Sequence, residues 1–306
     1  MKEYQLIVSE DMHKERIDKC IAESYCELSR SYIQKLIKDQ LVFLNGVTCK
    51  ANTRVECDDI IVFTIKDATL PDIVPENIPL DILYEDSDVI VVNKPKNMVV
   101  HPAPGHYSGT LVNAIMNHCK EELSGINGVL RPGIVHRIDK DTTGSVIICK
   151  NDHSHEAIAA QLKEHSITRE YVAIVHGNII EDEGVINAPI GRSPKDRKKM
   201  AINYQNGKSA VTHYRVLKRF GTYTYISCRL ETGRTHQIRV HMASIKHPII
   251  GDEVYSQAGF PLKLTGQTLH AKTLGFIHPS TGEYVEVIAP LPAYFIKVLE
   301  YLDAKK

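Results

Sequence analysis

Apolar residues recur with two different spacings along the chain, and each spacing predicts a different kind of element. Near the beginning, Ile33, Leu36 and Ile37 follow the i, i+3, i+4 spacing of a helix that buries one face, and Ser29 can cap its first turn. Shortly afterwards, residues 42–47 read Val-Phe-Leu-Asn-Gly-Val, which predicts two short strands joined by an Asn-Gly turn. These elements indicate a small α/β domain.

The rest of the chain carries apolar runs without a regular alternation of strand and helix. Because a doubly wound parallel sheet would require that alternation, we predict an α+β domain on a mixed, largely antiparallel sheet with flanking helices. A helix is predicted at 156–162. The predicted strands are 60–63, which closes the small domain, and 89–92, 145–149, 171–175 and 223–230.

Prolines separate the two parts of the chain. Pro71, Pro75 and Pro79 make this stretch unsuitable for a helix or a central strand, because proline lacks the backbone N–H that both need. We therefore predict a small domain over residues 1–66, a linker over 67–80 and a large domain over 81–306.

Composition narrows the class of protein without defining its function. The 306 residues include 37 basic and 37 acidic side chains, so no charged tail is indicated. Seven cysteines occur without a Cys-x-x-Cys pair, which favours reduced thiols over a disulfide framework or a zinc ribbon. The sequence has no signal-peptide pattern and no apolar run near the ~20 residues of a membrane span. We expect a cytoplasmic protein without membrane contact, and a monomer.

Charge is segregated along the chain although its sum is zero. Residues 185–240 contain twelve Lys and Arg against two acidic residues, which creates a positive field suited to a polyphosphate backbone. A solvated face balanced by acidic neighbours in space is the alternative. The small domain has no such excess, but its predicted helix groups side chains that can contact phosphates without reading sequence. They are Arg30, Gln34, Lys35 and Lys38.

The segment with the most specific chemistry is 133–144, Gly-Ile-Val-His-Arg-Ile-Asp-Lys-Asp-Thr-Thr-Gly, which an apolar strand follows. An Asp in such a loop is held by rigid scaffold and remains open to a substrate. The neighbouring cations Arg137 and Lys140 would keep Asp139 ionised. An ionised carboxylate can attack as a nucleophile or stabilise a sugar cation. The segment alone leaves open that Asp139 merely caps the turn that follows it.

Two further segments carry candidate partners for this carboxylate. Arg234 lies on the turn before a helix that Thr235 can cap, and its guanidinium fork matches a carboxylate. A structural ion pair with Glu231 is the alternative. Tyr171 begins an apolar strand, where it can belong to the core or stack on a flipped base. The histidines of these segments lack the spacing of a metal site, so no metal is expected.

The order of these segments resembles the RluA family of RNA pseudouridine synthases across residues 77–303. The first domain resembles an S4 RNA-binding domain through residues 16–19, 29–38 and 45–46, an arrangement typical of members that modify large-subunit ribosomal RNA. Two departures, Ile138 for the usual Leu and Ser145 for an apolar residue, do not touch the proposed chemistry. The matching segments of the large domain are 93–95, 100–102, 109–113, 133–144, 169–171, 232–241, 251–252 and 269–271.

The resemblance implies that the chain isomerises uridine to pseudouridine in structured RNA, either large-subunit ribosomal RNA or an assembling subunit, without a cofactor. Asp139 would attack C1′ of the ribose or remove the 2′ proton to form a glycal, and both routes stay open. Arg234 would hold Asp139 ionised, Tyr171 would stack on the uracil and take the C5 proton, and Arg137 would replace the flipped base or bind a phosphate. The other expected RNA contacts are Arg30, Lys35, Lys38 and Arg239.

Two other classes of function are compatible with parts of the pattern. A non-catalytic S4-type factor in ribosome assembly would need the segregated charge and the small domain, but not Asp139 between two cations. A glycoside hydrolase usually pairs two carboxylates. Asp139 and Asp141 are candidates, but their surroundings are cationic and the strand order does not suit a barrel.

Overall fold

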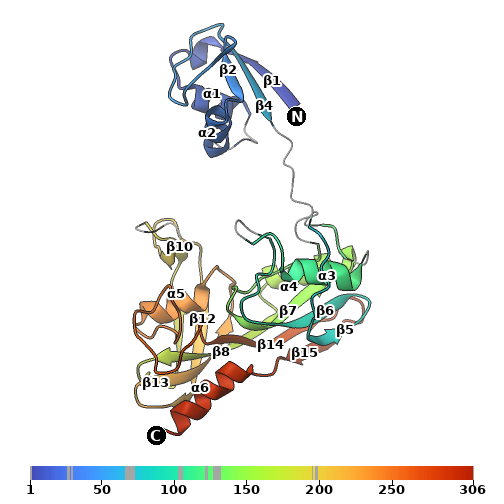
Figure 1. Cartoon of the computed structure of the whole chain (residues 1–306), viewed down its shortest axis with the longest axis vertical. Helices are drawn as coiled ribbons and strands as arrows, with labels where there is room; N and C mark the ends of the chain where they lie inside the picture. The colour runs from blue at the N-terminus through green and yellow to red at the C-terminus, as the bar shows by residue number, and fades with distance from the viewer. Residues whose placement is uncertain are drawn as a thin grey trace. The chain divides into compact units, whose positions relative to one another are not determined.

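The chain forms two compact units, Met1–Leu70 and Pro71–Lys306, and the division falls within the predicted linker (Figure 1). The structure is a computed structural model. The predicted cap Ser29 lies outside the residues that it describes, which are 2–25, 28, 30–65, 73–102, 106–120, 123–126, 132–194, 196 and 199–305.

The first unit is a four-stranded antiparallel sheet, in the order β1-β4-β2-β3, with two helices against it. The predicted apolar stripe is confirmed, because Ile33, Leu36 and Ile37 are all buried in one cluster with Phe63. The elements are β1 (Lys2–Ile7), a 3-10 helix (Glu10–Met12), α1 (Ile17–Ser24), α2 (Arg30–Lys38), β2 (Val42–Leu44), β3 (Val47–Thr48) and β4 (Ile60–Ile65).

The second unit is built on a sheet in the order β5-β6-β7-β14-β8-β13-β12-β9, with β15 paired to part of β14. Only β7 and β14 run parallel among the described strand pairs of this sheet, so the predicted mixed, largely antiparallel α+β class is confirmed. The strands are β5 (Ile82–Glu85), β6 (Val89–Lys94), β7 (Thr143–Cys149), β8 (Thr168–His176), β9 (Glu183–Asn187), β12 (Val211–Arg219), β13 (Tyr223–Leu230), β14 (Leu269–Ile277) and β15 (Tyr284–Ile288). A separate hairpin joins β10 (Ile190–Arg192) to β11 (Met200–Ile202).

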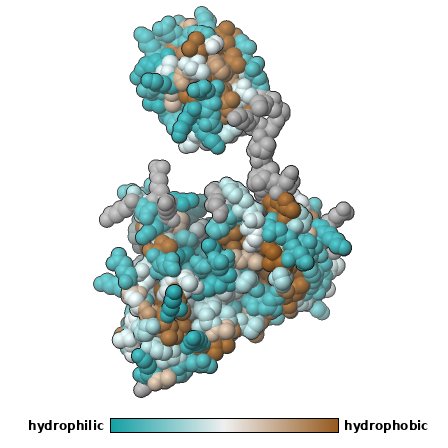
Figure 2. Space-filling model, in the orientation of Figure 1, coloured by the Kyte–Doolittle hydropathy of each residue, from teal (hydrophilic) through white to brown (hydrophobic). Residues whose placement is uncertain are grey.

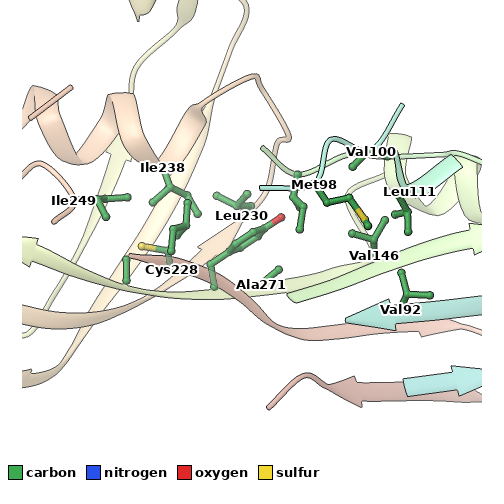
Figure 3. Packing of buried hydrophobic residues seen from close by; sticks show 14 of the residues in the cluster. Val92, Met98, Val100, Leu111, Val146, Cys228, Leu230, Ile238, Ile249 and Ala271 are labelled. Carbon is green, nitrogen blue, oxygen red and sulfur yellow. The ribbon is translucent and has the colours of Figure 1, made fainter. Parts of the chain in front are cut away.

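Both faces of this sheet are covered by helices, and all seven residues of β7 are buried. One face packs with α3 (Leu111–Cys119) and α5 (Gln237–Ser244), and in Figure 3 Leu111 lies near Val146 and Ile238 near Cys228. The alternate residues Ile147 and Ile174 pack in clusters with α4 (Asp152–Lys163) and α6 (Ala293–Asp303). Two-sided burial explains why the central strands read as continuous apolar runs. The outer surface in Figure 2 is mostly hydrophilic, with smaller hydrophobic patches.

Two glycines fix the ends of the loop that carries Asp139. Gly144 has φ 110°, and a Cβ there would collide with the carbonyl oxygen of Ala271 on the parallel strand β14. Gly133 has φ 68°, and a Cβ there would collide with the carbonyl oxygen of Cys149. Only glycine combines these positive φ values with such close backbone approaches. The loop therefore leaves and rejoins the sheet at two fixed points.

Candidate active site

Asp139 is held by a buried arginine that a second carboxylate shares. The Asp139 side chain is 18% exposed, and its Oδ2 accepts a 3.0 Å hydrogen bond from Nη1 of Arg239. Arg239, only 6% exposed, donates Nε and Nη2 to the two oxygens of Asp252 at 2.7 and 2.9 Å. The guanidinium thus presents its bidentate edge to Asp252 and a single N–H to Asp139.

This arrangement defines what each oxygen of Asp139 can do. Burial alone would lower the pKa of Arg239, but the hydrogen bonds and charges of Asp252 and Asp139 outweigh burial and raise it, so the guanidinium stays charged. Oδ2 of Asp139 is occupied by that guanidinium. Among the described residues no group donates a hydrogen bond to Oδ1, and Nε2 of His236 lies 3.9 Å from it. Oδ1 is therefore the oxygen that is free to meet a substrate.

The ion pair of Asp139 differs from two predictions made from the sequence. Arg239, not Arg234, pairs with Asp139, and Nε of Arg234 donates instead to the carbonyl of Ser209 at 2.9 Å. Arg239 was expected to contact RNA, but it is buried between two carboxylates. Glu231 was the alternative partner of Arg234, but its Oε1 lies 2.6 Å from Nε2 of His213.

The start of α5 explains why the sequence favoured the wrong arginine. Thr235 does not cap this helix, which begins at Gln237 after His236 in a left-handed conformation (φ 57°). The side chain of Gln237 fastens the turn instead. Its Oε1 accepts from the backbone N of Arg234 at 2.9 Å, and its Nε2 donates to the carbonyl of Val211 at 2.9 Å. With the helix starting there, residue 239 rather than 234 faces the interior.

His236 was weighed from the sequence only as a metal ligand, and the structure gives it a different position. Its Nδ1 lies 2.8 Å from the hydroxyl of Tyr255, and that hydroxyl accepts a 3.0 Å hydrogen bond from the backbone N of Met200. Burial lowers the pKa of His236, which favours the neutral ring. The other ring nitrogen, Nε2, is the one that faces Asp139, at 3.9 Å from Oδ1.

The other predicted site residues meet around Asp139. Arg137, Tyr171 and Arg234 line the same pocket, together with apolar side chains such as Leu230. The pocket opens into a cleft of about 580 Å³, within the roughly 300–1,000 Å³ typical of ligand sites. Tyr171 is 8% exposed, and burial raises the pKa of its hydroxyl, which is therefore protonated at neutral pH.

Two side chains, those of Lys94 and His136, anchor the loop of Asp139. Nζ of Lys94 donates to the carbonyls of Pro95, Met98 and Lys140 at 2.8, 2.8 and 3.0 Å. Burial lowers the pKa of Lys94 to about 7, and only the protonated amine can serve all three carbonyls at once. Nε2 of His136 accepts from the backbone N of Ile147 at 3.0 Å, and burial lowers the pKa of His136 to about 3. The loop is thus tied to β7 as well as to β6.

In the first unit, the buried carboxylate of Asp18 organises the predicted RNA-binding face. It accepts hydrogen bonds from Arg16 and Arg30 at 3.0 Å and from Gln34 at 2.6 Å. Burial alone would raise the pKa of Asp18, but these bonds hold it well below its usual range. Arg30 is therefore partly committed within the domain, whereas the other two predicted contacts, Lys35 and Lys38, are exposed.

Histidines that could have bound a metal are engaged elsewhere. The contacts of His136 and His236 are described above. Nδ1 of His241 lies 2.8 Å from the hydroxyl of Thr212, and its Nε2 lies 3.0 Å from the carbonyl oxygen of Ala188. In the part of the chain that the structure describes, no three His, Cys, Asp or Glu side chains group to hold a metal ion. None of the described helices has the length and apolarity needed to span a membrane.

Comparisons with known proteins define the family. A family model described as RNA pseudouridylate synthase matches residues 88–244, and an S4-domain model matches residues 15–61. The chain belongs to the RNA pseudouridylate synthase family and carries an S4 domain. It is an RNA pseudouridine synthase.

Its relatives extend over the whole chain. An uncharacterized RNA pseudouridine synthase of Bacillus subtilis, YlyB, is 51% identical over 302 residues, 99% of either chain. The ribosomal large subunit pseudouridine synthase D of Zymomonas mobilis is 44% identical over 94% of either chain. That of Escherichia coli O6:H1 is 40% identical over 97% of this chain and 93% of its own. Among solved structures, human RNA pseudouridylate synthase domain containing 1 aligns with a TM-score of 0.56 and 25% identity, over 75% of this chain and 96% of its own.

The two arginines should differ in their effect on stability. Arg239→Ala leaves the buried carboxylate of Asp252 without its partner, so we expect the free energy of unfolding to fall by roughly 3–5 kcal/mol. Arg234→Ala removes one bond to a carbonyl and should cost about 1 kcal/mol or less. Urea unfolding followed by circular dichroism measures both. Equal losses would contradict the assignment of Arg239 as the buried partner.

Proposed function

We propose that this enzyme isomerises uridine in structured large-subunit ribosomal RNA, free or within an assembling subunit, with Asp139 as its catalytic carboxylate and no cofactor. The observation that carries the proposal is the single-sided pairing of Asp139, whose Oδ2 is bound to Arg239 while the side chain lines the pocket. The substrate class is supported by relatives named as ribosomal large subunit enzymes and by the S4 domain.

The reaction needs a carboxylate more than any other group. The N1–C1′ bond breaks, the uracil turns, C5 bonds to C1′, and the C5 proton leaves, so no oxidant or energy source is consumed. Positive charge develops at C1′, and an ionised Asp139 can attack that carbon or remove the 2′ proton instead. Both routes use the free oxygen Oδ1.

Tyr171 is proposed to hold the uracil and to take part in moving its C5 proton. Its ring lines the pocket beside Asp139, where an aromatic face can stack on a base. Since burial raises the pKa of its hydroxyl, Tyr171 enters the reaction protonated. It can then accept the C5 proton only while giving its own proton to a base. On either route Asp139 is a free carboxylate again once C5 has bonded to C1′, and it lines the same pocket.

Two further arginines are proposed to contact the RNA around the flipped base. Arg137 is exposed at the rim, with Nη1 3.3 Å from Nε2 of His101, and Arg234 lines both the pocket and the cleft. Arg137 is suited to replace the extracted base in the stack, and Arg234 to contact a phosphate. Flipping costs a few kcal/mol in a duplex and less in a loop, so a loop uridine is the favoured target.

The S4 unit is proposed to add affinity through phosphate contacts from Lys35 and Lys38, with Arg30 oriented by Asp18. One chain contributes every group that the proposed reaction uses. A monomer is therefore sufficient, and we propose that the enzyme acts as one.

Asp139→Asn should abolish isomerisation. On an unmodified large-subunit rRNA transcript labelled with tritium at uridine C5, wild type should release tritium and the variant should be slower by a factor on the order of 1,000 or more. Asp141→Asn is the matched control and should change the rate by no more than about threefold, since it lies outside the proposed chemistry. Normal release by Asp139→Asn would contradict the proposed role, and loss in both variants would indicate a damaged loop.

Tyr171→Phe separates stacking from proton transfer. The aromatic face is preserved, so KM should stay within about threefold, whereas kcat should fall by roughly 100-fold or more because a proton-transfer group is lost. Steady-state tritium release at saturating transcript measures kcat. An unchanged kcat would limit Tyr171 to stacking.

Reversing the charge of two lysines on α2 tests whether the S4 unit binds RNA. We expect Lys35→Glu combined with Lys38→Glu to weaken transcript binding and to flatten its salt dependence, because each lost phosphate contact removes about 0.7–0.9 from the slope. Single-turnover rates at saturating enzyme should be unaffected. Filter binding across a KCl series is the measurement, and a slope equal to that of wild type would exclude this face from RNA contact.

A further inference from the structure

The cleft beside Asp139 extends well past the pocket that would hold one base. Its inner part shares Arg137, Asp139, Tyr171 and other residues with that pocket. Its remaining part, here called the outer cleft, reaches the C-terminal end of α4. The outer cleft is lined by Val135, Leu162, Lys163, His165 and Arg169, among others.

Arg169 is a buried cation without an anionic partner. Its side chain is only 7% exposed, and Nη2 donates to the carbonyl of Glu231 at 3.1 Å. Its Nε–H is buried and has no acceptor among the described residues, and no carboxylate among them pairs with the guanidinium. Gly233 leaves room for this group, because a Cβ there would lie 2.8 Å from Nη1. A buried charge and an unused donor are both unfavourable unless a ligand satisfies them.

The charge around Arg169 selects the class of ligand. Lys163, the last residue of α4, is exposed at the same cleft and pairs with no carboxylate among the described residues. Asp139 is the only acidic residue among those that line the cleft, and it already binds Arg239. The outer cleft therefore presents uncompensated positive charge next to apolar side chains, which suits a phosphate group attached to a nucleoside.

We propose that the outer cleft binds the phosphodiester and the nucleotide next to the target uridine. Arg169 turns its free Nε–H to a phosphate oxygen, a side-chain adjustment of the kind common on binding, and Lys163 contacts the same phosphate from the rim. The apolar side chains of Leu162 and Val135 face the neighbouring nucleoside. This subsite rests on the proposed function, because it places the RNA strand along a line from Asp139 to the end of α4.

The test compares two exposed helical lysines in the full chain, Lys163→Gln and Lys297→Gln. Lys297 lies on α6, which packs against the sheet face opposite Tyr171, so it is a matched control. The probe is the unmodified large-subunit rRNA transcript, bound across a KCl series. We expect Lys163→Gln to weaken binding by roughly 5–10-fold at low salt and to lower the salt slope by about 0.7–0.9. Lys297→Gln should match wild type.

Identical affinities and slopes for the two variants would overturn the subsite. Tritium release by wild type on the same transcript tests the proposed reaction separately. If release is absent but Lys163→Gln alone loses affinity, the reaction assignment fails and the phosphate subsite stands.

Discussion

One buried arginine shared by two carboxylates is the interaction on which the site depends. Arg239 is oriented by the fully buried Asp252, whose Oδ1 also accepts the backbone N–H groups of Val254 and Tyr255. Binding of the Nε–Nη2 edge to Asp252 fixes the plane of the guanidinium, and one N–H of Nη1 in that plane meets Asp139. The carboxylate proposed to react is therefore oriented by an almost fully buried ion pair, and in that proposal its second oxygen meets the substrate.

The surrounding fold brings Asp139, Arg239 and Asp252 together. The loop of Asp139 is fixed by glycines at both ends and by Lys94 and His136 along its length. Arg239 enters from α5, whose start is set by Gln237. Because each contributor is tied to the sheet independently, the geometry of the site depends on the rigidity of the core rather than on contacts within the loop.

Patterns local in sequence predicted most of the fold and half of the site. The strand at 223–230 coincides with β13, and the helix at 156–162 lies within α4, because apolar spacing reports directly on burial. Asp139, Tyr171 and Arg137 share the pocket as expected. The partner of Asp139 was missed because Arg234 and Arg239 are equally suitable by residue type. Choosing between them required the first residue of α5, which a glutamine side chain sets through contacts about 25 residues away. The positions of His236 and Asp252 likewise depend on contacts distant in sequence.

The single parallel strand pair has a consequence for how the protein is made. Thr143 and Gly144, at the end of the loop of Asp139, pair with His270 and Ala271, and Asp139 itself binds a residue 100 positions further along. During translation, the segment that carries Asp139 leaves the ribosome long before the segments that complete its surroundings. At that stage the nascent chain contains Asp139 but not yet Arg239, with which Asp139 pairs in the folded protein. The surroundings of Asp139 are complete only after Arg239 and the strand β14 have been synthesised and have docked.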